Sequence, residues 1–307
     1  MNALLGFVLK EEKECPPAFV GEVLGLEVDI SSPRIAVRVS QRRLESLLGL
    51  IAGVRAAGAL LPGTAGRLVG KLQFACSGMF GKVGRAALQP LYSRQRARRG
   101  SAALSRSLLA ALDFFASLLG DPPARLLPAP GAPRPPAVLY TDGNGAACIG
   151  AVLFERGEPP SVLSCRVPPG VMGLLLPREQ QNALIELIAV VVAFEVFAAD
   201  LKGRDVILMV DNQTAEGTVR NGYARRVSAD ACALASLLWL RCAALQVDLF
   251  VQWVSSEENI ADGPSRPDEP DKSRALASLA PRPVAMPVFP AAVGTALRED
   301  LGWPLAM

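Results

Sequence analysis

The chain has 307 residues, of which 50% are hydrophobic and 20% charged, with a formal net charge of +3. This length and apolar content favour about two domains with buried cores. The sequence contains no histidine, which excludes Ser-His-Asp and Cys-His catalysis as well as histidine-based zinc sites. Six cysteines without a C-x-x-C pair leave oxygen atoms as the ligands of any metal site, and these suit Mg²⁺ or Mn²⁺.

The first 120 residues predict a small sheet followed by a group of helices. Residues 21–30 are mostly apolar, and residues 35–39 alternate as a half-buried strand does. An amphipathic helix begins after Ser40, a plausible cap. Two further helical stretches cover residues 65–92, which glycines interrupt, and residues 101–119.

A proline-rich stretch at residues 121–136 predicts a semi-rigid spacer, because neither a helix nor a central strand tolerates this proline density. Residues 267–307 are again proline-rich and are expected to form a largely irregular tail. Residues 137–266 lie between these stretches and predict an α/β domain. The strands expected there are 137–140, 147–154, 162–167, 205–210 and 247–254, and the helices are 178–201, 213–220 and 228–244.

A basic cluster stands before the first proline-rich stretch. Its members are Lys82, Arg85, Arg94, Arg96, Arg98 and Arg99. Such a cluster can contact nucleic-acid phosphates, although a solvated helix end explains the segment equally well when it is taken alone. The longest apolar stretch, residues 187–199, is too short to span a bilayer, and no export signal is visible at the start. We therefore expect an intracellular protein, cytoplasmic or nuclear, without a membrane partner.

Four acids occupy separate settings that together predict a metal site. Asp142 follows an apolar strand, Glu186 lies in an apolar helix, Asp211 ends a buried strand, and Asp262 lies in a polar loop. Singly, a turn explains Asp142, a helix N-cap explains Asp211, and a surface loop explains Asp262. Glu186 is harder to explain, because a carboxylate on an apolar helix face is costly unless it is paired or coordinated.

The joint pattern resembles the ribonuclease H domain of retroelement reverse transcriptases, and that of DIRS-like elements most of all. The matching phrases are Tyr-Thr-Asp-Gly at 140–143, the helix glutamate, Asp-Asn at 211–212, and Asn-Ile-Ala-Asp-Gly-Pro-Ser-Arg at 259–266. The resemblance implies a mixed five-stranded sheet with flanking helices over residues 137–266. It also implies that Asp142, Glu186, Asp211 and Asp262 are the catalytic, metal-binding acids, with Asn212 and Asn259 as substrate-binding residues.

The sequence also departs from the family pattern in this domain. The glycine-rich turn after the first aspartate is short, and the loop before Asp262 has no histidine. The segment between Asp211 and Asp262 also leaves no room for the basic protrusion with which some family members hold the hybrid. Residues 1–120 resemble the primer-grip hairpin, thumb and connection of the same polymerases, most visibly at residues 23–28, 70–74 and 88–91. No Asp-Asp dipeptide supplies a palm site, so we expect no DNA synthesis from this chain alone.

The resemblance implies metal-dependent endonucleolytic cleavage of the RNA strand of RNA–DNA hybrids. Two Mg²⁺ ions about 3.5–4 Å apart would serve, with Mn²⁺ as a substitute. The basic cluster would hold the hybrid by its phosphates, and the polymerase portion of a retroelement is the expected partner. Two alternatives remain: an inactive remnant that only binds nucleic acid, and a 3′–5′ exonuclease. The exonuclease is disfavoured because residues 255–266 contain no tyrosine or histidine.

Overall fold

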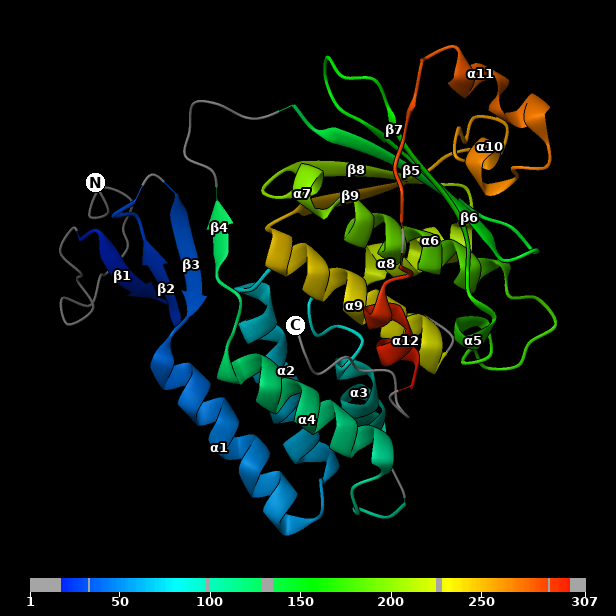
Figure 1. Ribbon diagram of the computed structural model, residues 1–307. Helices are drawn as coiled ribbons and strands as arrows, with labels where there is room; N and C mark the ends of the chain where they lie inside the picture. Colours follow the sequence, from blue (N-terminus) through cyan, green and yellow to red (C-terminus); the bar gives the residue numbers. More distant parts are fainter. Residues whose placement is uncertain are drawn as a thin grey trace.

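The computed structural model describes residues 18–32, 34–97, 100–127, 135–224, 228–286 and 288–298. These residues form a mixed α/β structure with two sheets, a group of four helices, and further helices around the larger sheet (Figure 1). Arg98 and Arg99 of the basic cluster lie outside the described residues, as does part of the predicted spacer.

The smaller sheet has four antiparallel strands, whereas the sequence predicted strand structure for this sheet only at residues 21–30 and 35–39. They run in the order β1 (Val20–Val23), β2 (Leu26–Asp29), β3 (Ile35–Val39) and β4 (Arg125–Leu127). The turn between β1 and β2 contains Leu24 and Gly25 with φ of 53° and 82°, as two-residue hairpin turns require. Strand β4 falls within the expected spacer, so that expectation is wrong for these residues. The strand occupies a proline-free gap and pairs with β3.

Four helices follow the hairpin and β3, and they pack into a common core. They are α1 (Gln41–Ala57), α2 (Pro62–Ser77), α3 (Leu88–Arg96) and α4 (Arg106–Gly120). The predicted helix over residues 65–92 is therefore two helices. The interruption contains Gly81 and Gly84 with φ of 55° and 79°, a conformation that glycine adopts without steric cost.

The larger sheet is mixed and has six strands rather than the predicted five. Its order is β10 (Arg282–Pro283), β7 (Ser161–Arg166), β6 (Cys148–Phe154), β5 (Ala137–Gly143), β8 (Asp205–Val210) and β9 (Asp248–Trp253). Strands β5, β6 and β7 form an antiparallel meander, while β8 and β9 run parallel to β5. The sixth strand comes from the expected tail and lies parallel to β7 at the sheet edge.

Helices cover both faces of this sheet (Figure 1). On one face lie α6 (Asn182–Val196), α8 (Gln213–Asn221) and α9 (Ala229–Leu245), with the short α5 (Pro169–Met172) and α7 (Ala198–Leu201). The other face carries α10 (Asp262–Ser265) and α11 (Arg274–Ala277), joined by the 3₁₀ helix η3 (Pro270–Ser273). The strands alternate accordingly: Leu139 joins the main core, while Tyr140 packs with Ala261 and Leu276.

The C-terminal residues are more ordered than the sequence predicted. Helix α12 (Ala291–Arg298) packs against α9 and buries Val293 and Ala296 in the main core. The expectation of a largely irregular tail is therefore wrong for the described residues, because apolar side chains at helical spacing find a partner surface. Among the described residues, no helix combines the length and apolarity that crossing a bilayer requires.

The two halves of the chain share one continuous hydrophobic core. Gly81, before α3, packs directly on the Trp239 ring of α9, and a side chain at this position would clash with it. Gln246, after α9, accepts a hydrogen bond from the Leu126 amide (3.0 Å) and donates to the Ala124 carbonyl (3.0 Å). These contacts bring α3 and its preceding turn beside α8 and α9.

Candidate metal centre

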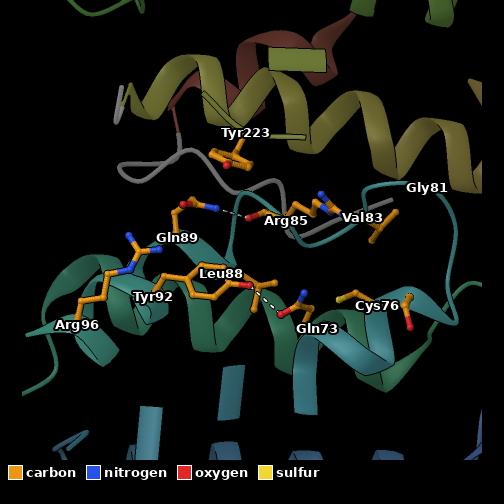
Figure 2. Close-up of a pocket in the computed structure, with 11 residues that line it drawn as sticks. Gln73, Cys76, Gly81, Val83, Arg85, Leu88, Gln89, Tyr92, Arg96 and Tyr223 are labelled. Carbon is orange, nitrogen blue, oxygen red and sulfur yellow. Dashed lines mark hydrogen bonds between the residues drawn. The ribbon is translucent and has the colours of Figure 1, made fainter. Parts of the chain in front are cut away.

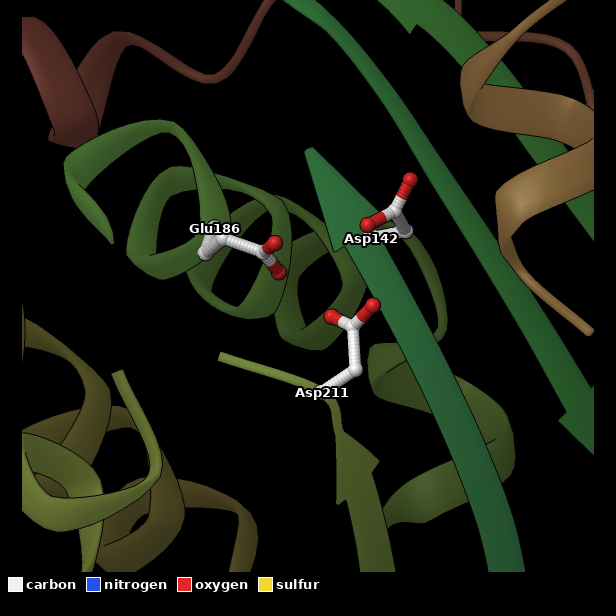
Figure 3. Close-up of side chains that lie close together, drawn as sticks. All are labelled: Asp142, Glu186 and Asp211. Atoms are coloured by element: carbon white, nitrogen blue, oxygen red, sulfur yellow. The ribbon is translucent and has the colours of Figure 1, made fainter. Parts of the chain in front are cut away.

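Three of the four predicted acids meet at the carboxyl ends of β5 and β8. Asp142 lies near the end of β5, Asp211 directly follows β8, and Glu186 projects from the second turn of α6; one carboxylate oxygen from each lies within 4.8 Å of the others (Figure 3). Because β5 and β8 are parallel neighbours, their carboxyl ends are adjacent, and α6 packs against β5 and β6.

A glycine allows this close approach of helix and strand. A Cβ atom on Gly143 would lie 2.8 Å from the Ile185 carbonyl carbon and 2.9 Å from the Glu186 nitrogen, both of which are backbone atoms. Any side chain at residue 143 would therefore push α6 away from β5. The Asp-Gly pair that could have indicated a simple turn instead ends a strand beneath a helix.

The three carboxylates are short of compensating partners. Asp142 and Glu186 are 3% and 5% exposed. Within the described part of the chain, no group hydrogen-bonds to Glu186 Oε2 or Asp211 Oδ1, although both atoms are buried. Burial, with the charges of Asp142 and Asp211, raises the pKa of Glu186 to about 10. Burial likewise raises the pKa of Asp142. Clustered oxygens that lack partners fit a hard divalent cation, which would restore the charged forms.

Asp262, the fourth predicted acid, does not join the cluster. Its two oxygens form ion pairs with Arg266 Nε at 2.7 Å and Lys272 Nζ at 2.8 Å. Its charge nevertheless contributes to the raised pKa of Asp142, so it borders the cluster. The structure thus brings together three acids and holds the fourth with two cations.

Ser265 is a site residue that the sequence did not single out. Its hydroxyl donates to Asp142 Oδ2, which opposes the rise in the pKa of Asp142. The loop that carries it lies directly on β6: a Cβ atom on Gly150 would lie 2.5 Å from the Ser265 nitrogen. Asn144 Nδ2 also donates to the Ser265 carbonyl at 2.7 Å. The signal was present in the phrase at 259–266, where Ser265 follows Asp262 by three residues.

The two asparagines have structural hydrogen bonds. Asn212 caps α8 by accepting from the Thr214 and Ala215 amides at 3.0 and 3.1 Å, so Asp211 is not the cap. Asn259 is 3% exposed, and its amide donates to the Thr141 carbonyl at 3.0 Å. The substrate-binding role expected for Asn259 does not fit this burial. The residue instead attaches the segment between β9 and α10 to β5. Asn212 remains at the edge of the acid cavity.

The acids line an open cavity of about 470 Å³. Polar side chains from several elements surround them, including Asn144, Asn182, Asn212, Ser256, Arg266 and Glu269. A cavity that combines clustered carboxylates with amides and one guanidinium can hold a cation together with a phosphate group.

The four described members of the basic cluster do not form one phosphate-binding surface. Arg94 donates to the carbonyls of Ser101 and Ala103, which holds the turn before α4. Lys82 packs against Gly222, and burial lowers its pKa. Arg85 and Arg96 line a second cavity. None of these residues lines the acid cavity.

The sequence matches no family model, and no curated protein matches it. Among the solved structures that are similar to this chain are two ribonucleases H. One is the N-terminal ribonuclease H domain of a Mycobacterium tuberculosis protein, solved as a fusion with maltose-binding protein (TM-score 0.32, 16% identity, 47% of this chain and 97% of that one). The other is ribonuclease H1 of Halobacterium salinarum (TM-score 0.30, 16% identity, 41% of this chain and 88% of that one). These similarities are too low to assign an activity to this chain.

Proposed function

We propose that this chain is a metal-dependent ribonuclease that cleaves the RNA strand of RNA–DNA hybrids. One observation carries the proposal: Asp142, Glu186 and Asp211 converge from β5, α6 and β8, and Glu186 and Asp211 each have a buried oxygen without a partner among the described residues. These three residues would hold Mg²⁺, or Mn²⁺ as a substitute, because carboxylate oxygens suit such ions.

A divalent cation bound here would lower the pKa of a water molecule and stabilise charge on the leaving oxygen. The residues of the chain position the carboxylates that would hold the ion. Ser265 fixes the Asp142 carboxylate, and Gly143 lets Glu186 approach it. Since the sequence contains no histidine, no imidazole takes part in proton transfer. Phosphoryl transfer of this kind depends mainly on positioning and electrostatic stabilisation, which these residues can supply.

An RNA–DNA hybrid is the substrate that the cavity supports best. Asn182 and Arg266 line it beside the acids, and amide and guanidinium groups can bind 2′-hydroxyls and phosphates. We assign this activity to residues 137–266 and a primer-grip, thumb and connection-like role to residues 1–120. The polymerase portion of a retroelement would be the partner of both.

Asp262 would join the centre only after its ion pairs with Arg266 and Lys272 break. With Arg266 and Lys272 in place, the three clustered acids can hold one ion. A second ion would require the Asp262 carboxylate to turn toward the cluster. We therefore propose that Asp142, Glu186 and Asp211 act as primary ligands and that Asp262 acts as a conditional fourth ligand.

The direct test uses an RNA–DNA hybrid labelled within the RNA strand and incubated with the full chain in Mg²⁺, Mn²⁺ or EDTA. We expect internal RNA cuts with either metal and none in EDTA. The variants Asp142→Asn and Asp211→Asn should reduce cleavage to the EDTA level. Asp205→Asn is the matched control, because Asp205 is exposed at the opposite end of β8. Cleavage that persists in both acid variants would refute the proposed centre.

A second candidate is a module that binds nucleic acid without cutting it. The observation in its favour is the pairing of Asp262 with Arg266 and Lys272, which leaves the acid set incomplete. Hybrid that binds but stays intact in both metals would favour this candidate over the ribonuclease.

A further inference from the structure

A second cavity, of about 420 Å³, lies where the two halves of the chain meet. Figure 2 shows Gln73 of α2 and Gln89, Tyr92 and Arg96 of α3 on one side, with Tyr223 opposite them. Tyr223 follows α8, so the cavity needs both halves of the chain. It shares no lining residue with the acid cavity.

The charge of this cavity favours an anion. Arg85 and Arg96 line it, and no acidic residue of the described part of the chain does. Arg85 is exposed, and the guanidinium carbon of Arg96 lies 5.7 Å from the centre of the Tyr92 ring. Such an arginine is held over an aromatic face and still presents its N–H groups outward.

The aromatic rings give the cavity a second kind of contact. Tyr92 and Tyr223 come from opposite sides of it (Figure 2). The Tyr92 hydroxyl donates to Gln73 Oε1 at 3.0 Å, and Gln89 Nε2 donates to the Arg85 carbonyl at 3.1 Å. These bonds hold one ring and both amides in place. Stacking surfaces beside arginines are the usual means of binding an unpaired base together with its phosphate.

We propose that this cavity binds one nucleotide of a single-stranded segment of nucleic acid. Its volume lies in the range of small-ligand sites and is too small for a duplex. The base would stack on Tyr92 or Tyr223, and the phosphate would contact Arg85 and Arg96. The choice of a nucleic-acid strand as occupant rests on the proposed function, whereas the charge and the rings come from the cavity itself.

Helix α8 relates this cavity to the metal centre. Asn212 at its N-terminus lines the acid cavity, and Tyr223 lies just beyond its C-terminus. Nine helical residues span about 14 Å. At about 3.4 Å per nucleotide along a stacked strand, a strand that follows α8 would place about four nucleotides between the two cavities. The cavity would therefore bind the strand where it leaves the hybrid.

The test measures binding of the full chain by fluorescence anisotropy in EDTA, so that cleavage does not contribute. The probes are a blunt hybrid, hybrids with a ten-nucleotide overhang on either strand, and adenosine 5′-monophosphate as a competitor. The variants are Tyr223→Ala, Tyr223→Phe and Arg85→Ala, with Arg67→Ala as the control. Arg67 is an exposed residue of α2 that does not line the cavity. Thermal unfolding checks that each variant folds.

We expect one overhang hybrid to bind more tightly than the blunt hybrid. Tyr223→Ala should weaken only that hybrid, by about 5- to 100-fold, whereas Tyr223→Phe should retain binding because it keeps the ring. Arg85→Ala should reduce the salt dependence of log Kd by about 0.7 for one lost phosphate contact, and Arg67→Ala should not.

Three results would overturn the proposal. The first is equal affinity for blunt and overhang hybrids, and the second is an equal change in the salt dependence of log Kd for Arg85→Ala and Arg67→Ala. The third is displacement of the strand by micromolar adenosine 5′-monophosphate. The last result would assign the cavity to a free nucleotide. A chain that cuts hybrids without preferring an overhang would disprove this proposal alone. A chain that prefers an overhang without cutting would disprove only the proposed function.

Discussion

Lys272 places its side-chain nitrogen 2.8 Å from Asp262 Oδ2 and so connects the fourth acid to the segment that follows its loop. Arg266 holds the other oxygen at 2.7 Å. The Asp262 side chain is only 9% exposed, whereas that of Lys272 is 46% exposed. The Lys272 side chain can therefore move into solvent more easily than the Asp262 side chain can. A metal ion that binds Asp262 would displace the lysine.

Replacing Lys272 should strengthen metal binding. Lys272→Met leaves Asp262 with one ion pair instead of two. Because the Lys272 end of the lost pair is exposed to solvent, we expect a change in affinity of about two- to fivefold. Calorimetric titration with Mn²⁺ measures the effect. Lys202→Met, an exposed lysine after α7, is the control. An unchanged Mn²⁺ affinity would show that Asp262 is not available to the centre.

Glu186 should make the metal-free protein less stable as the pH rises. Its pKa is raised from 4.5 to about 10 in the fold, so the folded state binds this proton over a pH range in which the unfolded state has released it. The associated stability is complete below 4.5 and is lost as the pH rises through about 10.

Glu186→Gln should remove much of this pH dependence. The variant mimics the protonated acid, and we expect its Tm in EDTA at pH 9 to exceed that of the wild type by at least about 2 °C. Thermal unfolding between pH 5 and pH 10 is the measurement. Glu179→Gln, in the exposed segment before α6, should leave the curve unchanged. Parallel curves for Glu186→Gln and the wild type would contradict a buried, protonated Glu186.

Ser265→Ala should shift the acidic limb of the pH–rate profile to higher pH. The Ser265 hydroxyl lowers the pKa of Asp142, so its loss raises that pKa and a higher pH is needed to ionise the acid. Residues that orient a metal ligand typically contribute about 10- to 100-fold to metal affinity or activity.

Ser164→Ala is the matched control for this prediction. Ser164 donates to the Pro264 carbonyl at 2.6 Å, which anchors the same loop without contacting Asp142. If Ser164→Ala shifts the profile as much as Ser265→Ala does, then loop anchoring explains the effect and the hydrogen bond to Asp142 does not.

Gly150→Ala should displace the loop that carries Ser265 and Asp262. The added Cβ would lie 2.5 Å from the Ser265 nitrogen and 2.6 Å from the Ala261 oxygen, and backbone atoms cannot turn aside. We expect a loss of about 1–3 kcal/mol in the free energy of unfolding. Hydrogen exchange should also become faster over residues 259–266.

Gly70→Ala provides the comparison. A Cβ on Gly70 would meet no atom within 4 Å, and the residue lies inside α2, so alanine should stabilise the protein by about 0.5–1 kcal/mol. Exchange over residues 259–266 that stays slow in Gly150→Ala would show that the loop does not depend on this contact.

Local patterns in the sequence were sufficient for most elements, whereas the grouping of the acids needed more than local patterns. The apolar run before Asp211 predicts β8, and the nearly continuous apolar face around Glu186 predicts a buried helix, because burial and periodicity are properties of a short segment. Of the acids, only Glu186 has a local setting that itself calls for pairing or coordination, because a helix N-cap is an ordinary place for Asp211. The convergence of Asp142, Glu186 and Asp211 depends on the order of the strands, which these local patterns do not give and which the family resemblance implied.

Only the tertiary structure decided the contacts between segments far apart in the chain. Strand β4 exists because β3 offers it a partner, and α12 is buried because α9 offers it a surface. The hydrogen bond from Ser265 to Asp142 joins residues 123 positions apart. The pairing of Asp262 with Lys272 depends on how the chain turns through η3. Propensity and periodicity describe a segment by itself, whereas these contacts depend on which surfaces the fold brings together.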